Sequence, residues 1–258
     1  MIANYHTHTY RCRHAGSYTD REYVEAAIRA GYGQLGFSDH APIIGPWDRP
    51  CMLPESLPDY VQSVLALKEE YADQITIFLG LEAEYVPDRF DSFMDTVESY
   101  PFDYLILGQH DIFGQPKYIR TFWESKDPEF LDIYCNQCAD GLRTGVYSYW
   151  AHPDVFHFTG DPALFEERMR QMCRLANSLS IPLELNLTGV RLGFHYPNPD
   201  FWRIVGEEGC QVIYGCDAHS PMELWDTEQV LKTAYDLTER FNLQVIEQLS
   251  LRKPIRNK

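Results

Sequence analysis

Seven of the nine histidines in this 258-residue chain occur in short polar segments that follow apolar runs. His157 and His195 stand apart from this pattern. A single histidine is usually a hydrogen-bonded structural residue, but independent placement would not gather seven of them after predicted strands. We therefore expect one shared metal site. The segments are NYHTHTY, RCRHAG, GFSDHAP, LGQHDI, WAHPDV and CDAHS, which contain His6, His8, His14, His40, His110, His152 and His219.

Two pairs of polar residues have the spacing expected of ligands on extended backbone. Side chains two positions apart in an extended segment point to the same side, which applies to His6 with His8 and to Asp217 with His219. Each pair can direct two ligands into one cavity. One such pair is a weak signal, but several strand ends with the same chemistry predict a metal centre.

A further carboxylate is expected at the end of the segment LGLEAEY. Either Glu82 or Glu84 can face the site, because they also stand two apart, and spacing does not choose between them. One glutamate, Asp217 and the seven histidines make nine donors, whereas a catalytic zinc-like ion takes about three protein ligands. Three ions with a bridging carboxylate fit this set best. Imidazole and carboxylate donors without thiolate suit Zn, Mn or Fe alike.

The charge of such a centre favours a phosphate ester as substrate. Three divalent ions contribute about +6, and two carboxylates with a bridging hydroxide offset about three of these charges. The pocket is then positive in a protein whose formal net charge is −16. Water bound to such ions loses its proton near neutral pH, and the other ions neutralise oxygens of the transition state. The pattern predicts phosphate-ester hydrolysis.

Short apolar runs alternate with amphipathic segments along the chain, which is typical of a parallel sheet covered by helices. Thr19 and Glu22 form a capping box at a helix start, Gly31 stands where that helix ends, and Asp161-Pro162 opens another helix. Seven β/α units can close into a barrel or form an open sheet, and both place ligands at the carboxyl ends of strands. The expected strands are Ile2–Tyr5, Gln34–Phe37, Ile75–Leu81, Asp103–Leu107, Tyr147–Trp150, Pro182–Asn186 and Gln211–Tyr214.

Composition predicts a single domain without linkers, since the 16 glycines and 16 prolines are scattered along the chain. The net charge of −16 argues against a nucleic-acid partner, which requires a basic stripe. The N-terminal residues have no signal-peptide pattern, and no run approaches the roughly 18 apolar residues of a membrane span, so we expect a cytoplasmic protein. The basic tail at about 252–258 is expected to be a solvated terminus, and it contains Arg252, Lys253, Arg256 and Lys258.

The seven cysteines are odd in number and irregularly spaced, which does not indicate a disulfide framework. Cys135 and Cys138 form a C-x-x-C pair, but no second pair or neighbouring histidine completes a zinc site. Their segment reads as a helix with Asp127 as N-cap and Pro128 at its first position. We expect them to be incidental helix residues.

The motifs taken in order resemble the polymerase-and-histidinol-phosphatase (PHP) family of metallohydrolases, most closely its monofunctional histidinol-phosphate phosphatases. The resemblance covers nearly the whole chain, through HTH, YVEAAIRAGYGQLGFSDHAP, GLEAEY, GQH, AHPD and YGCDAHSP. It implies an α/β fold, a distorted (β/α)7 barrel of the TIM-like PHP type, in one domain over residues 1–258. The implied reaction is hydrolysis of L-histidinol phosphate to L-histidinol and phosphate, a step of histidine biosynthesis.

The resemblance also implies how three divalent ions divide the ligands, and it selects Glu82 over Glu84. Glu84 is then a structural carboxylate or one that supports a ligand. The implied sets are His6, His8, Glu82 and Asp217 for one ion, Glu82, His110 and His152 for the second, and His14, His40 and His219 for the third.

Three further residues receive less specific roles. The segment NLTGVR ending at Arg191 resembles a family segment whose arginine grips the substrate phosphate, and the alternative is a structural salt bridge. Asp39 is expected to orient the site or to give a proton to the leaving alkoxide, although a loop-capping role is equally compatible. His157 stands where the family often has a basic residue after His-Pro-Asp, so it is a candidate substrate ligand.

Two departures from the family pattern bear on the substrate rather than on the metals. This chain has GQH where histidinol-phosphate phosphatases often have Gly-Ser-x-His, and Val155-Phe156-His157 where basic residues are frequent. Alternatives therefore remain within the family: a phosphoesterase acting on a nucleotide, a phosphotyrosine or a phosphodiester. A non-catalytic metal-binding domain is the alternative outside enzymes.

Overall fold

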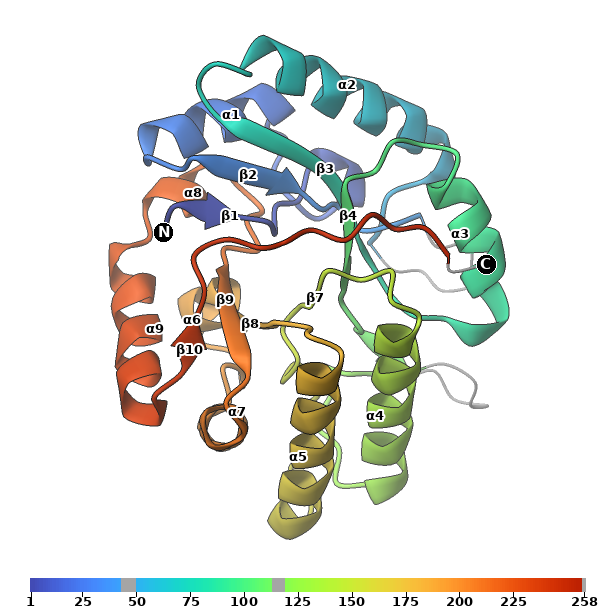
Figure 1. The fold of residues 1–258 in the computed structure, drawn as a ribbon, viewed down its shortest axis with the longest axis vertical. Coiled ribbons are helices and arrows are strands. Elements are labelled where there is room, and N and C mark those ends of the chain that lie inside the picture. Colours follow the sequence, from blue (N-terminus) through green and yellow to red (C-terminus); the bar gives the residue numbers. More distant parts are fainter. Residues whose placement is uncertain (43–49, 113–118, 257–258) are drawn as a thin grey trace.

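The predicted alternation of strands and helices runs through the computed structural model, which describes residues 1–42, 50–112 and 119–256 (Figure 1). Parallel strands form one sheet in the order β1-β2-β3-β4-β7-β8-β9-β10. All seven predicted strands are confirmed, with small shifts at their ends. The bounds are β1 Ala3–Asn4, β2 Gln34–Phe37, β3 Thr76–Ala83, β4 Tyr104–Leu107, β7 Tyr149–Trp150, β8 Leu183–Asn186, β9 Gln211–Gly215 and β10 Gln244–Val245.

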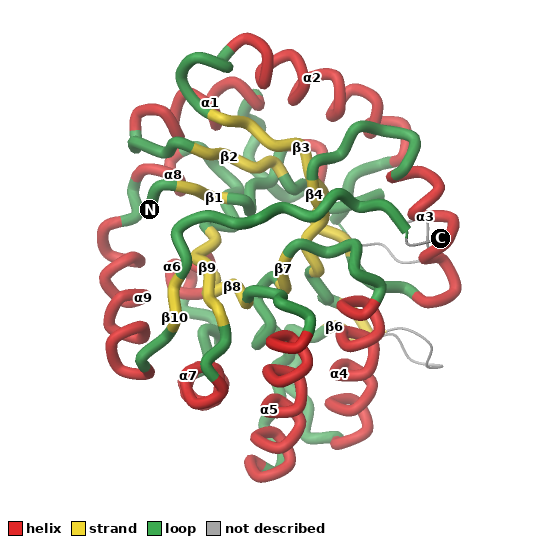
Figure 2. The backbone as a smooth tube through the Cα atoms, in the orientation of Figure 1, coloured by secondary structure: helices red, strands yellow, loops and turns green. Residues whose placement is uncertain are grey.

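Helices pack around the outside of the curled sheet, as the red segments of Figure 2 show. Short 3-10 turns are η1 Tyr10–Cys12, η2 Pro54–Ser56 and η3 Pro87–Arg89. Apolar side chains on the outer face of the strands pack against these helices and form the larger core. The helices are α1 Asp20–Arg29, α2 Leu57–Glu70, α3 Phe90–Val97, α4 Pro128–Arg143, α5 Pro162–Ser178, α6 Leu187–Leu192, α7 Pro199–Glu208, α8 Met222–Trp225 and α9 Glu228–Phe241.

The sheet closes into a barrel only at the carboxyl ends of its strands. A parallel bridge joins Thr7, after β1, to Ala218, after β9, with His8 N donating to Ala218 O at 2.9 Å. At the amino end a cavity of about 360 Å³ lies between β1, β9 and β10, lined by Ala3, Ile213 and Val245. The distorted barrel predicted from the family resemblance is therefore confirmed, and its closed end is the end where ligands gather.

Two features of the sheet were not predicted. The strand β10 is only two residues long and follows α9 directly, which leaves almost no sequence signal. It pairs in parallel with β9 and forms one edge of the sheet. After β4, the short strands β5 (Asp111–Ile112) and β6 (Ile119–Arg120) form an antiparallel pair beside the carboxyl end of the barrel.

The predicted helix starts are confirmed, and the capping box of α1 has both of its hydrogen bonds. Thr19 Oγ1 accepts from Glu22 N at 3.4 Å, and Glu22 Oε2 accepts from Thr19 N at 2.7 Å. Asp127 and Asp161 cap α4 and α5. The seven cysteines are free and buried. Cys135 and Cys138, the C-x-x-C pair, lie in α4 as expected.

Thr19→Ala removes this cap, and we expect it to lower the free energy of unfolding by about 1 kcal/mol. The reason is that the Glu22 amide loses its acceptor and the Glu22 carboxylate loses its donor hydroxyl. Urea unfolding followed by circular dichroism measures the change. Ser17→Ala, at an exposed position just before the helix, is the matched control. Equal stability of the two variants would contradict this account of the helix start.

The C-terminal segment does not extend into solvent. It crosses the amino end of the barrel (Figure 1), where Leu249 and Leu251 pack on the small inner core around Tyr5 and Tyr104. Arg252 donates to Leu179 O at 2.6 Å, and Arg256 forms ion pairs with α3 and the residue after it. The expectation of a solvated terminus is therefore wrong for these two arginines, because the C-terminal segment packs across the open end of the barrel. Lys258 lies outside the described residues.

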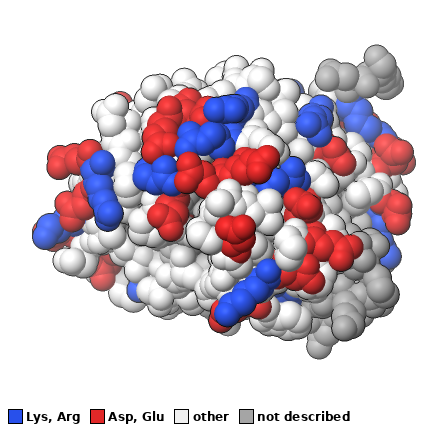
Figure 3. Space-filling model, turned by 90° about the horizontal axis from the view of Figure 1, so that it is seen from below, with Lys and Arg blue, Asp and Glu red and all other residues white. Residues whose placement is uncertain are grey.

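On the face of the molecule in Figure 3, basic and acidic side chains are interspersed. Ion pairs also link α5 and α7, where Arg170 pairs with Glu166, Glu207 and Glu208 at 2.6–2.8 Å. Among the described residues, every helix is too short or too polar to span a membrane.

Candidate metal centre

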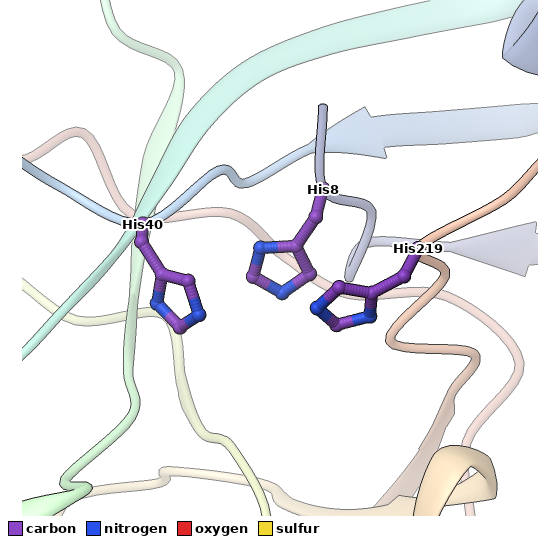
Figure 4. Close-up of side chains that lie close together, drawn as sticks. All are labelled: His8, His40 and His219. Atoms are coloured by element: carbon purple, nitrogen blue, oxygen red, sulfur yellow. The ribbon is translucent and has the colours of Figure 1, made fainter. Parts of the chain in front are cut away.

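All nine predicted ligands converge at the closed end of the barrel, where they follow or end six of the parallel strands. Figure 4 shows three of them, His8, His40 and His219, whose rings lie side by side although they come from the ends of β1, β2 and β9. Two of the predicted ligands, His152 (φ 29°) and Asp217 (φ 47°), adopt the left-handed backbone region, which is uncommon for such residues and concentrates at functional sites.

Glu82, near the end of β3, lies at the centre of the cluster and is buried. Its Oε2 is 3.6 Å from His6 Nε2, 3.6 Å from His8 Nε2 and 2.8 Å from His40 Nδ1. Within the described part of the chain, the buried His6 Nε2 has no hydrogen-bond partner. One oxygen of this carboxylate therefore meets three imidazoles, as a ligand shared between ions would.

The other oxygen of Glu82 faces a second pair of histidines. Glu82 Oε1 is 2.8 Å from His152 Nε2 and 3.5 Å from His110 Nε2. Glu84 instead lies 3.4 Å from the Nδ1 atom of His110, on the opposite side of that ring. The geometry thus separates the two glutamates that sequence spacing left open: Glu82 is central, and Glu84 contacts the back of one histidine.

The spacing of the donor atoms fits a tetrahedral metal ion. Asp217 Oδ1 lies 3.5 Å from His6 Nε2 and 3.0 Å from His8 Nε2, and these nitrogens are each 3.6 Å from Glu82 Oε2. A tetrahedral ion with ligands at about 2.1 Å places its ligand atoms roughly 3.4 Å apart. The four residues therefore have the separation that a divalent ion requires.

His14 and His219 meet in a way that also requires a positive charge. Their Nε2 atoms are 2.9 Å apart, while each Nδ1 faces a backbone carbonyl, that of Cys12 at 3.1 Å and that of Asp217 at 2.9 Å. In neutral rings whose Nδ1–H donates to a carbonyl, both Nε2 atoms carry lone pairs. Two lone pairs at this distance are stabilised by a cation between or beside them.

The electrostatics of the cluster give the same result. Burial lowers the pKa of His6, but Glu184 and the other nearby carboxylates raise it to about 10. Burial raises the pKa of Glu82 and Asp217, yet the surrounding histidines hold both pKa values well below their usual range. The buried, ionised carboxylates of this cluster therefore need positive charge nearby. Protonated histidines or bound metal ions can provide it.

A buried carboxylate that sequence reasoning missed orients one of the ligands. Glu184, in β8, places Oε1 2.8 Å from His6 Nδ1, and its Oε2 accepts from the backbone N–H of His152 at 3.0 Å. Such a carboxylate behind a histidine fixes the tautomer that leaves Nε2 free for a metal. The sequence signal that could have identified Glu184 is its position between Leu183 and Leu185 in PLELN. Alternation along a strand places its side chain on the face opposite to the two leucines.

Glu184→Gln is expected to lower metal affinity about 10- to 100-fold while the fold is retained. Glutamine keeps the shape of the side chain, but it removes the charge that holds the His6 ring. Competition with a chromophoric chelator measures the affinity, and circular dichroism checks the fold. Glu69→Gln, at an exposed position of α2, is the control for loss of one negative charge. Wild-type affinity in Glu184→Gln would show that this carboxylate only supports the barrel.

Asp39 lies behind a ligand and away from the cavity. Its carboxylate accepts from Thr9 Oγ1 and from His40 N, and it lies 3.5 Å from His8 Nδ1, opposite the Nε2 atom that faces Asp217. Burial raises the pKa of Asp39, but His8 and its other partners lower it overall, so the carboxyl is a poor proton donor. This placement fits the predicted orienting role and not the proton-donor role.

Cys12 is a donor that the sequence reasoning left out. Its buried thiol lies within ligand distance of two groups, His14 with His219 and His8 with Asp39. Burial raises the pKa of this thiol, but hydrogen bonds to His14 and His8 lower it overall. The predicted donor set contains no thiolate, but η1 turns Cys12 back toward the histidines and makes it a further candidate donor.

A cavity of about 400 Å³ opens beside the cluster. Seven of the nine predicted ligands line it, and so do Phe122, Phe194 and Tyr196. An adjoining cavity of about 360 Å³ shares His14, His40, His110 and Phe122 and also reaches Arg120. These volumes are in the range of small-molecule sites.

The structure sets the other two predicted substrate residues back from this cavity. Arg191 donates to Thr188 Oγ1 and to Glu223 O, each at 3.1 Å, and both of those residues line the cavity. His157 stacks on His195, with ring centroids 4.1 Å apart, and His195 separates it from Phe122. Direct contact of Arg191 or His157 with a phosphate stays a prediction.

Comparison with known proteins relates this geometry to characterised families. A probable histidinol-phosphatase of Deinococcus radiodurans is 29% identical over 235 residues, covering 86% of this chain and 88% of the relative. A histidinol-phosphatase of Bacillus subtilis is 32% identical over 123 residues, covering 44% of this chain and 46% of the relative.

A solved structure has the same fold over the whole chain. The histidinol phosphate phosphatase of Lactococcus lactis, crystallised with zinc, L-histidinol and phosphate, aligns with a TM-score of 0.76 and 21% identity over 100% of this chain and 99% of its own. The model of the PHP domain matches residues 4–188, which is most of the sequence and includes the strands β2 to β8. This chain belongs to the PHP domain family.

Proposed function

We propose that this protein is a metal-dependent phosphomonoesterase that hydrolyses L-histidinol phosphate to L-histidinol and phosphate. The observation that carries the proposal is the cluster of nine predicted donors beside a small cavity, which seven of them line. Relatives named histidinol-phosphatase, one of which aligns over most of both chains, support the choice of substrate. The activity belongs to histidine biosynthesis, which we place in the cytoplasm.

The residues would hold three divalent ions, divided as the family resemblance implies. Glu82 would contribute to two of these ligand sets, because its two oxygens face different histidines. When bound, such ions acidify water and neutralise the oxygens of a phosphate. Zinc, manganese and iron all suit the donors, with zinc found in the Lactococcus lactis structure.

The chain's own residues prepare this site in three ways. Glu184 and Asp39 hold the backs of His6 and His8, so that the Nε2 atoms of both rings face inward. Phe122, Phe194 and Tyr196 wall the cavity and limit access of water to the bound ester. The histidine cluster, mostly buried, provides the positive potential that attracts the phosphate group.

Steady-state assays test the proposal. The metal-loaded protein is expected to hydrolyse L-histidinol phosphate with a kcat/KM well above that for p-nitrophenyl phosphate, and chelation is expected to abolish both activities. Turnover of histidinol phosphate no faster than of p-nitrophenyl phosphate would refute the substrate. Absence of any phosphatase activity in protein with bound metal would favour a non-catalytic domain. Complementation of a histidine auxotroph lacking its histidinol-phosphate phosphatase tests the role in the cell.

A further inference from the structure

One carboxylate in the cavity is not used by the metal centre. Among the described residues that line the cavity, Glu223 is the carboxylate left over once Glu82 and Asp217 are assigned to ions. It lies in the first turn of α8, and its Oε2 accepts from His219 N at 2.5 Å and from Ser220 N at 3.2 Å. Its head group is therefore fixed next to a metal ligand at the wall of the cavity.

The backbone around Glu223 is held in place as well. Arg191 donates from one guanidinium to Glu223 O and to Thr188 Oγ1, and Thr188 donates to the backbone of Asp217 at 3.0 Å. This connects α6, α8 and the ligand loop after β9. A carboxylate held this rigidly loses little conformational freedom when it binds a ligand.

Three aromatic rings line the cavity together with the predicted metal ligands, and the Tyr196 ring lies 6.2 Å from the ring of His152. Phe122 is 38% exposed and Phe194 is 41% exposed, although both are apolar. Their ring centroids are 5.3 Å apart, and each is 5.7 Å from the ring of the buried Tyr196. The phenylalanines pack edge to face, an arrangement that leaves ring surface available to a flat ligand.

We propose that Glu223, Phe122 and Phe194, which line the same cavity, form the leaving-group subsite and select esters that carry both an ammonium group and a flat ring. Glu223 pairs with the ammonium group, and Phe122 and Phe194 contact the ring. The inference rests on the proposed function and names the residues that make it specific. Physically, an ammonium group near divalent ions is repelled, and a fixed carboxylate at that point offsets the repulsion.

Four phosphate esters distinguish recognition of the ammonium group from recognition of the ring. L-histidinol phosphate has amine and ring, imidazolylpropyl phosphate has only the ring, ethanolamine phosphate has only the amine, and p-nitrophenyl phosphate has a ring without an amine. Glu223→Gln is expected to raise KM for L-histidinol phosphate about 10-fold or more. Its KM for imidazolylpropyl phosphate is expected to stay within about twofold of wild type. Glu228→Gln, an exposed carboxylate in the first turn of α9, is the matched control.

The phenylalanine variants give the complementary result. Phe194→Ala is expected to raise KM about 10-fold for the ring-bearing esters and to leave ethanolamine phosphate within about twofold. Equal effects of Glu223→Gln on aminated and deaminated esters would overturn the proposal, because a purely structural carboxylate acts on every substrate alike.

Binding of the product separates this inference from the proposed function. Calorimetric titration of the metal-loaded protein with L-histidinol and with imidazolylpropanol requires no turnover. Glu223-dependent preference for L-histidinol in a protein without phosphatase activity would support the subsite and refute the proposed function. Phosphatase activity without a Glu223-dependent preference for L-histidinol would support the proposed function and refute the subsite.

Discussion

Glu82→Gln is expected to lower kcat/KM by about 10³-fold or more, since metal ions supply several kcal/mol of transition-state stabilisation and about 1.4 kcal/mol corresponds to a factor of ten. The physical reason is the position of this carboxylate, whose two oxygens face histidines from four strand ends. A glutamine amide retains one oxygen, but it cannot bridge two ions or balance their charge. Mass spectrometry of the metal content is expected to show loss of bound ions together with the loss of activity.

Glu84→Gln is the comparison variant, and its loss of activity is expected to be smaller than that of Glu82→Gln. Glu84 is as deeply buried and stands two residues away, but its carboxylate faces the back of the His110 ring. Its replacement is expected to cost about 10- to 100-fold in activity, as for carboxylates that orient a ligand. Equal loss of metal and activity in both variants would contradict the assignment of Glu82 as the shared ligand.

Gly108→Ala is expected to lower activity about 10²-fold or more with the fold intact, because it displaces a catalytic group by roughly an ångström. A Cβ atom at position 108 would lie 1.9 Å from Glu82 Oε1 and 2.5 Å from its Cδ. The barrel interior has no room for the methyl group unless the carboxylate moves. The measured quantities are kcat/KM, metal content and the circular dichroism spectrum.

Gly33→Ala provides the control for this substitution. Its added Cβ would meet only Ile2 O at 3.7 Å, an ordinary contact, and the residue precedes β2 far from the ligands. Activity is expected to stay near wild type. If Gly108→Ala bound metal and turned over substrate as Gly33→Ala does, the close packing of Glu82 against the end of β4 would be refuted.

Local sequence determined the strands, the capped helices and the segments that carry ligands. This follows because a parallel strand needs a short apolar run, a helix start needs a capping side chain, and carboxyl strand ends are the common location of sites. The capping box at Thr19 and the H-x-H spacing of His6 and His8 are complete within a few residues. The PHP resemblance then supplied the barrel and the choice of Glu82, which spacing alone did not.

The tertiary structure decided everything that depends on contacts between distant segments. It placed Glu184 behind His6, 178 residues away, brought Cys12 to the histidines and set Arg191 back from the cavity. It also folded the basic tail across the open end of the barrel. The nine predicted ligands were readable from sequence because all of them lie at or shortly after the carboxyl ends of strands. The groups that orient them, and the carboxylate and rings proposed to choose the substrate, acquire their roles only where separate strands and loops meet.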